Sequence, residues 1–207
     1  LYNGDVADTL FSSSTGGWTQ SAADAFGTSG RPYLVSVRDP YDTISPYHDW
    51  GPVPVTGKTL GSSVGVVGRV LDATVKRNAS RRVKALKVIS LSRGSQLTAT
   101  AGGAAIASAL GLRSSWFSVG VLSLQPPSPN PAVAPRTRVT LTGVVRGVHG
   151  VVLQRSTAAT PWSPFRTIKA GAFHFSVKPK VTTQYRLATT NDAAASVRIR
   201  VQAATVK

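Results

Sequence analysis

Residues 172–178 have the sequence Ala-Phe-His-Phe-Ser-Val-Lys, and this stretch decides the fold of the C-terminal part of the chain. Its apolar residues Phe173, Phe175 and Val177 alternate with polar ones. Successive side chains of a β-strand point to opposite sides of a sheet, so a period of two predicts a strand with one buried face. Residues 196–202 repeat this alternation with valine and isoleucine. Both stretches therefore predict strands of a half-buried antiparallel sheet.

Further strands of this kind are expected at short, regular spacing around the two stretches. They are predicted near residues 138–145, 151–155, 165–169 and 184–189. Six or seven short strands with this spacing are typical of an immunoglobulin-like β-sandwich. Several residues expected to face outward are basic and are candidates for binding a polyanion: Lys178, Arg186, Arg198 and Arg200.

A proline-rich segment separates this sandwich from the first part of the chain. Residues 125–135 are Gln-Pro-Pro-Ser-Pro-Asn-Pro-Ala-Val-Ala-Pro, a composition that favours an extended, semi-rigid linker. We predict a first domain at 1–124, the linker at 125–135 and the sandwich at 136–207. The whole protein is expected to be mainly β, with an α+β first domain that contains short helices.

The first domain is predicted to contain a β-hairpin, formed by strands at 69–76 and 83–91. The polar link between them includes Arg77, Arg81 and Arg82, which are further candidates for polyanion binding. A solvated hairpin end is the alternative interpretation of these charges. The other expected elements are strands at 5–13, 33–37, 97–101 and 116–122 and helices at 22–26, 56–64 and 104–110.

The composition limits the available chemistry. The chain has no cysteine, methionine or glutamate, and all eight of its acidic residues are aspartate. Disulfides and thiolate metal sites are therefore excluded, and no glutamate of this polypeptide can act as a catalyst. Without methionine, we expect a processed product or a fragment. No run of about 18 apolar residues is present, so no membrane-spanning helix is expected.

The formal charge of +16 is concentrated in the second half, where Asp192 is the only acidic residue after position 124. The positive electrostatic potential that this charge produces attracts polyanions, which include nucleic acid, anionic lipid and anionic wall polymer. Nucleic acid is not expected as the partner, because the sequence has no recognised nucleic-acid-binding motif and no interleaving of aromatic and basic residues.

Residues 11–50 concentrate the side chains that have specific chemistry. The hydroxyls and glycines at 12–17 suit either a loop that faces a polar ligand or a tight turn held by its own side chains. Prolines within 38–50 predict a rigid loop. His48 and Asp42 on this loop are weak candidates for acid–base chemistry, and turn formation is the alternative role of its aspartates. No metal-ligand spacing is present, so neither a metal nor another cofactor is expected.

Three stretches carry a resemblance to a known family. They are Leu-Phe-Ser-Ser-Ser-Thr-Gly-Gly at 10–17, Pro-Tyr-Leu-Val-Ser-Val-Arg-Asp-Pro-Tyr-Asp at 32–42, and Leu-Gly-Leu-Arg-Ser-Ser-Trp-Phe-Ser-Val at 110–119. With these stretches, residues 1–119 resemble the C-terminal part of the family of stage II sporulation protein D and the amidase enhancers. The tail resembles immunoglobulin-like modules of exported actinobacterial proteins.

The resemblance implies a secreted bacterial cell-wall protein that binds the glycan strands of peptidoglycan. In this family the sporulation member is a lytic transglycosylase, whose catalytic glutamate lies upstream of the stretch matched here. This chain has no glutamate, so we expect it to hold the substrate without being catalytic alone. The residues implied for glycan binding are Ser12, Ser13, Ser14, Gly16 and Gly17 for hydrogen bonds and Tyr41, Tyr47 and Trp50 for stacking on sugar rings. For Tyr41 and Trp50, packing of the loop against the domain is the alternative.

A rival hypothesis is a non-enzymatic, basic adhesive or structural module that binds an anionic wall polymer. If the first domain is cut through a sheet, it exposes an open apolar edge. We therefore expect either the upstream half of the same domain or a second copy of the chain as a partner.

Overall fold

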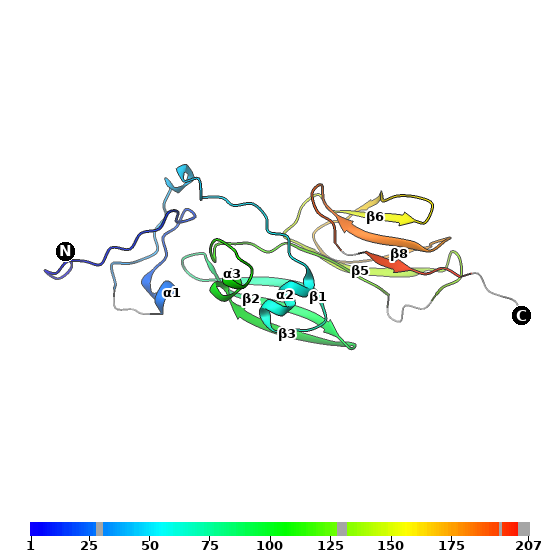
Figure 1. Cartoon of the computed structure of the whole chain (residues 1–207), viewed down its shortest axis with the longest axis horizontal. Helices are drawn as coiled ribbons and strands as arrows, with labels where there is room; N and C mark the ends of the chain where they lie inside the picture. Colours follow the sequence, from blue (N-terminus) through cyan, green and yellow to red (C-terminus); the bar gives the residue numbers. More distant parts are fainter. Residues whose placement is uncertain (28–30, 128–131, 195, 203–207) are drawn as a thin grey trace, which may run out of the picture.

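The computed structural model describes residues 1–27, 31–127, 132–194 and 196–202. The protein is mainly β, as predicted, with three antiparallel sheets and a few short helices. It is elongated, with the N-terminal segment at one end, a three-stranded sheet in the middle and a two-sheet sandwich at the other end (Figure 1). The described elements are, in chain order, α1 (Ala22–Phe26), the 3-10 turn η1 (Asp42–Ile44), α2 (Gly57–Val64), β1 (Arg69–Arg77), β2 (Val83–Ser92), β3 (Ser95–Gly102), α3 (Gly103–Ala109), β4 (Val121–Gln125), β5 (Val139–Arg146), β6 (Val152–Thr157), β7 (Ser163–Thr167), β8 (Gly171–Val177), β9 (Thr183–Ala188) and β10 (Val197–Ile199).

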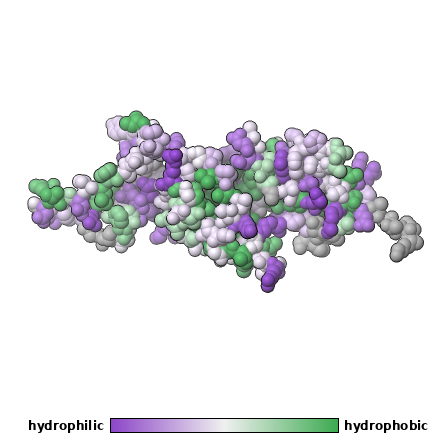
Figure 2. Space-filling model, viewed as in Figure 1, coloured by the Kyte–Doolittle hydropathy of each residue, from purple (hydrophilic) through white to green (hydrophobic). Residues whose placement is uncertain are grey.

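Apolar residues are exposed toward the N-terminal end of the molecule. Leu1, Val6 and Phe11 are each at least 88% exposed. In the space-filling view, apolar surface appears at this end as well as over the middle of the molecule (Figure 2). The N-terminal segment therefore contributes little to a hydrophobic core, and polar contacts must hold its position.

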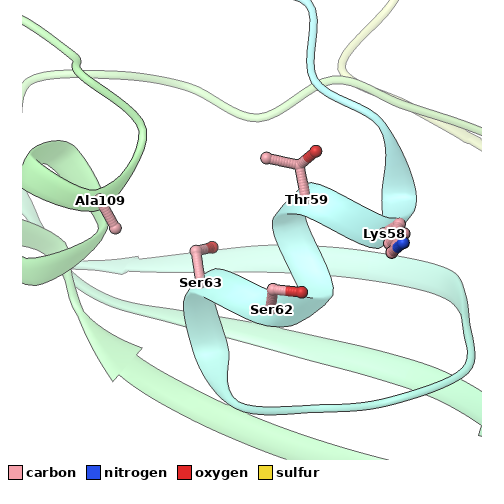
Figure 3. Close-up of a pocket in the computed structure, with 5 residues that line it drawn as sticks. All are labelled: Lys58, Thr59, Ser62, Ser63 and Ala109. Carbon is pink, nitrogen blue, oxygen red and sulfur yellow. The ribbon is translucent and has the colours of Figure 1, made fainter.

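The middle sheet has the order β1-β2-β3, and its hairpin confirms the strands predicted at 69–76 and 83–91. Helices α2 and α3 pack beside this sheet, with Ile106 of α3 fully buried in its core. The hydroxyl of Thr56 accepts a hydrogen bond from the Thr59 amide and begins α2, as an N-cap residue does. A shallow depression of about 590 Å³ lies between the two helices, lined by Lys58, Thr59, Ser62, Ser63 and Ala109 (Figure 3).

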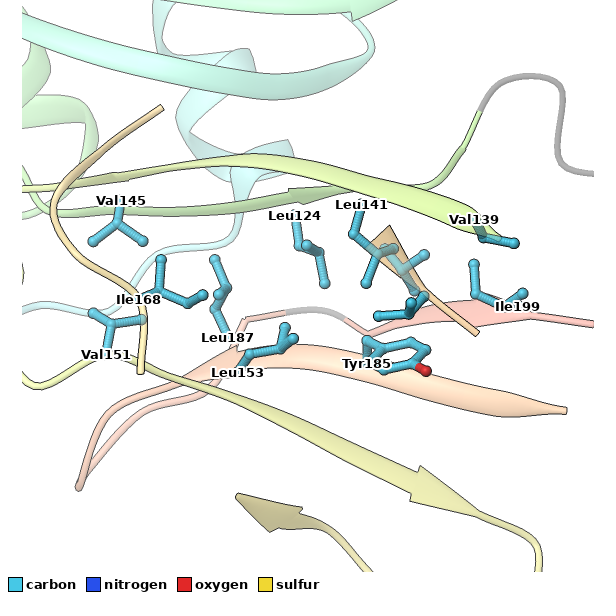
Figure 4. Packing of buried hydrophobic residues seen from close by; sticks show 12 residues of the cluster. Leu124, Val139, Leu141, Val145, Val151, Leu153, Ile168, Tyr185, Leu187 and Ile199 are labelled. Atoms are coloured by element: carbon cyan, nitrogen blue, oxygen red, sulfur yellow. The ribbon is translucent and has the colours of Figure 1, made fainter. Parts of the chain in front are cut away.

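The sandwich consists of the sheets β4-β5-β8 and β10-β9-β6-β7. Side chains from both sheets form one core, in which Leu141, Leu153, Leu187 and Ile199 are fully buried (Figure 4). Their alternation with exposed neighbours is the period-two pattern of the sequence. The predicted antiparallel strands of the tail are therefore present, and β4 adds one more strand to their sandwich.

Three sequence-based predictions of strands were wrong. Residues 6–13 contain no strand or helix, and 33–37 form no strand. Next to residues 33–37, the structure has an isolated bridge between Trp18 and Arg38. No adjacent residue pairs extend this bridge into a β-ladder among the described residues. The strand predicted at 116–122 begins at Val121 instead, and it pairs with β5 of the sandwich rather than closing the first sheet.

The proline-rich linker is described only in part, because residues 128–131 lie outside the described residues. Gln125 belongs to β4, and Val133 forms an isolated parallel bridge with Val201. Within the part of the chain that the structure describes, no helix is long and apolar enough to cross a membrane.

Candidate functional site

The carboxylate of Asp42 holds the hydroxyl-rich segment 12–17 in place. Asp42 begins η1, is buried, and accepts hydrogen bonds from the Thr15 amide (2.7 Å), the Ser14 hydroxyl (2.9 Å) and the Gly17 amide (3.1 Å). The Asp39 carboxylate accepts a further bond from the Thr15 hydroxyl at 3.0 Å. The buried carboxylate of Asp42 thus accepts several hydrogen bonds from a segment about 25 residues away in the sequence. These bonds hold the irregular backbone of that segment in one conformation.

His48 contacts the same carboxylate oxygen of Asp42 as Ser14 and Gly17. Its Nδ1 atom lies 2.5 Å from Oδ2 of Asp42. Burial alone would raise the pKa of Asp42, but hydrogen bonds from His48, Thr15 and Ser14 outweigh burial and hold it well below its usual value. The bond to Asp42 raises the pKa of His48, and the charges of Asp49 and Asp39 act in the same direction. His48 is therefore favoured as an imidazolium, which can donate a proton or a hydrogen bond but is a poor general base.

The segment that follows this loop is docked on the turn of the β1–β2 hairpin. The Ser80 hydroxyl is fully buried, donates to the Asp24 carboxylate at 2.6 Å and accepts from the Ser21 amide at 3.1 Å. Next to it, the Arg81 guanidinium lies 4.1 Å from the centre of the Trp18 ring. The structure thus joins two regions that the sequence separates, the hydroxyl-rich loop and the basic hairpin.

Arg82 makes the second connection between hairpin and loop. Its guanidinium donates to the Thr15 carbonyl at 3.1 Å and lies 5.3 Å from the centre of the Trp116 ring. Burial lowers the pKa of Arg82, and its buried Nε has no hydrogen-bond partner among the described residues. Trp116 also packs on Gly16, where a Cβ would lie 3.1 Å from the indole. Gly16 is therefore needed for this close packing, in addition to any role in binding.

The three aromatic candidates of the loop lie in different environments. Tyr41 is 77% exposed and Tyr47 is 54% exposed, so both present ring surface to solvent. Tyr47 also contacts the guanidinium of Arg113, 5.7 Å from its ring centre. Trp50 is half-buried and packs against the core of the middle sheet, which is the packing alternative considered for it.

The hydroxyl candidates are similarly divided. Ser14 is committed to Asp42, and the Ser12 hydroxyl donates to the Ser14 carbonyl at 3.0 Å. Ser12 and Ser13 are exposed, and the Ser13 carbonyl accepts from the Ser45 hydroxyl at 3.1 Å. Gly17, with a φ of 89°, adopts the left-handed backbone that glycine tolerates.

The basic candidates divide into a structural group and a surface group. On the hairpin, Arg77 donates to the carbonyls of Arg81 and Phe117, while Arg81 and Arg82 contact tryptophans as described above. Arg81 and Arg82 thus connect the hairpin to the loop, whereas Arg77 connects it to the segment that precedes β4. On the sandwich, Lys178 is exposed, Arg186 contacts Trp162, and Arg198 and Arg200 are exposed on or beside β10.

Sequence reasoning missed Trp18, Arg113 and Trp162, each of which contacts one of the candidate residues. A tryptophan flanked by serine and proline at 161–164 was the only local signal for the last of them. No group of three or more potential metal ligands is found within the described ranges. The depression between α2 and α3 contains none of the candidate residues.

Comparison with known proteins gave no assignment: no protein-family model matches the chain, and no curated protein matches it. Membership in the family of stage II sporulation protein D and the amidase enhancers stays a prediction.

Proposed function

We propose that the protein binds the glycan strands of peptidoglycan through its loop face, which consists of residues 12–17 together with Tyr41 and Tyr47. The observation that supports this proposal is the carboxylate of Asp42, which fixes the hydroxyl-rich segment beside two exposed tyrosines. A prearranged set of hydroxyls and rings loses little conformational entropy on binding, which favours recognition of a polar, extended ligand.

The chemistry of this face suits a sugar chain. Exposed Ser12 and Ser13 can exchange hydrogen bonds with sugar hydroxyls and N-acetyl groups, and the rings of Tyr41 and Tyr47 can stack on pyranose rings. The proposed role is therefore to hold substrate for a glycan-strand lyase or amidase in the bacterial cell wall, outside the cell.

The experiment is a pulldown of the whole chain with purified peptidoglycan sacculi. The double variant Tyr41→Ala/Tyr47→Ala is expected to bind at least about fivefold more weakly, since each ring contributes on the order of 1 kcal/mol. Phe26→Ala is the matched control, because Phe26 is an aromatic residue on α1 that is 61% exposed.

Salt distinguishes this interaction from simple charge attraction. Stacking and hydrogen bonding should persist from low to moderate ionic strength, whereas attraction between exposed charges is screened. Absence of the protein from the pellet at low salt would contradict the proposal. An equal loss in the tyrosine variant and in Phe26→Ala would do so as well.

A further inference from the structure

The four-stranded sheet of the sandwich carries a group of polar and basic side chains on its outward face. Gln154 of β6 pairs with Arg186 of β9, and Gln184 of β9 pairs with Arg198 of β10. The neighbouring pair Leu153 and Leu187 is fully buried in the core, so the alternating positions face away from it. None of these outward positions is acidic.

Trp162 extends this face beyond the strands. It belongs to the connection between β6 and β7, and its ring centre lies 4.2 Å from the guanidinium of Arg186. This stack places a half-buried indole beside the outward residues of β9 and restrains the arginine.

Hydrogen bonds within the face determine which groups it offers to a ligand. Arg186 donates through Nε to the amide oxygen of Gln154 at 2.9 Å, and the Ser196 hydroxyl donates to the amide oxygen of Gln184 at 3.1 Å. Each amide oxygen therefore already accepts one hydrogen bond from the protein. The two glutamines also carry NH₂ groups, which are donors, near the guanidinium of Arg186.

We propose that this outward face, centred on Gln154, Trp162, Gln184 and Arg186, is a second binding site that takes a polysaccharide bearing carboxylate groups. A donor-rich surface requires a ligand rich in acceptors, and the guanidinium edge of Arg186 matches the planar fork of a carboxylate. The amides and the indole then contact sugar hydroxyls and ring faces.

The same features argue against single-stranded nucleic acid as the ligand. Proteins that bind such strands present several aromatic rings on which successive bases stack. This face has one indole, and a ring face of it is directed to Arg186. The site is separate from the loop face, because it lies wholly on the sandwich, so it does not depend on the function proposed above.

The test measures binding of the full chain to polygalacturonate, with dextran as the uncharged polysaccharide and an oligothymidylate as the nucleic acid. Arg186→Gln is expected to weaken binding to polygalacturonate at least about fivefold, because it removes a charge-assisted hydrogen bond. Gln184→Glu should weaken it similarly by placing a carboxylate where the ligand needs a donor. Arg138→Gln removes the same charge from an exposed position beside β5 of the other sheet and should change binding less than about twofold.

Far-UV circular dichroism of each variant verifies that the sandwich is folded. If Arg186→Gln does not fold, Gln184→Glu provides the test. Equal weakening by Arg186→Gln and Arg138→Gln would overturn the proposal, because it would show attraction by net charge alone. The proposal would also be overturned if oligothymidylate bound as tightly as polygalacturonate and its binding depended on Arg186 to the same extent. The weakening caused by Arg186→Gln should be the same in a chain that also carries Tyr41→Ala/Tyr47→Ala, which keeps the outcome separate from that of the loop face.

Discussion

The Nδ1 atom of His48 lies 2.5 Å from Oδ2 of Asp42, the carboxylate that also receives hydrogen bonds from the segment 14–17. The imidazole and the backbone of the loop face thus share one buried anion. When the imidazole loses its charge, the carboxylate loses the one charged hydrogen-bond donor that it has among the described residues. The order of the loop face is therefore expected to depend on pH.

The first prediction concerns the alkaline side of this dependence. The pKa of His48 is raised in the folded protein above the ordinary value of 6.5. Its contribution to stability is fully present below pH 6.5 and is lost as pH rises through the raised folded value. The free energy of unfolding, measured by denaturant titration, should therefore fall over this window in the wild type. In His48→Gln the fall should be smaller, and identical pH profiles of the two proteins would contradict the prediction.

The second prediction concerns Asp42→Asn. The amide nitrogen of asparagine cannot accept the hydrogen bonds that Oδ1 or Oδ2 accepts, so donors from Ser14, Thr15 or Gly17 lose a partner. Each unsatisfied buried donor costs about 1–3 kcal/mol. Hydrogen exchange of the Thr15 and Gly17 amides should become faster by about tenfold or more, while the amides of the sandwich core keep their protection.

Asp49→Asn is the control for this variant, since Asp49 is exposed on the same loop. Its effect on exchange at Thr15 and Gly17 should be small. If Asp42→Asn leaves both amides as protected as in the wild type, the carboxylate does not hold the segment.

The sequence predicted those parts of the fold that depend on local pattern. The period of two in β8 and the short helix predicted at 22–26, which is α1, each depend on residues that are neighbours in the sequence. The segment 33–37 has strand-forming residues but lacks a paired neighbour, and a ladder requires two strands. β-strand propensity alone was therefore insufficient to predict the structure of this segment.

The candidate site was predicted as a region but not as an arrangement. The sequence identified the hydroxyls at 12–17 and the aspartates near 40, yet it gave no sign that Asp42 would bond the Thr15 amide 27 residues away. It also could not show that Arg82 reaches the Thr15 carbonyl across 67 residues. Such contacts depend on tertiary packing, which brings together residues that no local period relates.

The third prediction tests how the N-terminal segment is attached to the hairpin. Ser80→Ala removes the buried hydroxyl that bonds both the Asp24 carboxylate and the Ser21 amide. A loss of about 1–3 kcal/mol is expected locally. The segment should then detach more often, and trypsin should cleave after Arg38 several times faster than in the wild type.

Ser118→Ala is the control, because Ser118 is exposed near the same hairpin. It should leave the cleavage rate unchanged. Equal cleavage rates in Ser80→Ala and the wild type would show that other contacts alone attach the segment.

The last prediction uses two adjacent glycines at the junction of β3 and α3. A Cβ at Gly103 would lie 1.8 Å from the Val83 carbonyl oxygen, whereas one at Gly102 would meet nothing within 4 Å. Gly103→Ala therefore forces backbone atoms apart and should destabilise the protein by about 3 kcal/mol or more. Gly102 has a φ of −65° and a ψ of 143°, which alanine adopts without strain, so Gly102→Ala should change stability by no more than about 1 kcal/mol. Thermal unfolding of the two variants measures this contrast, and equal melting temperatures would show that the close approach of α3 to β2 is not required for stability.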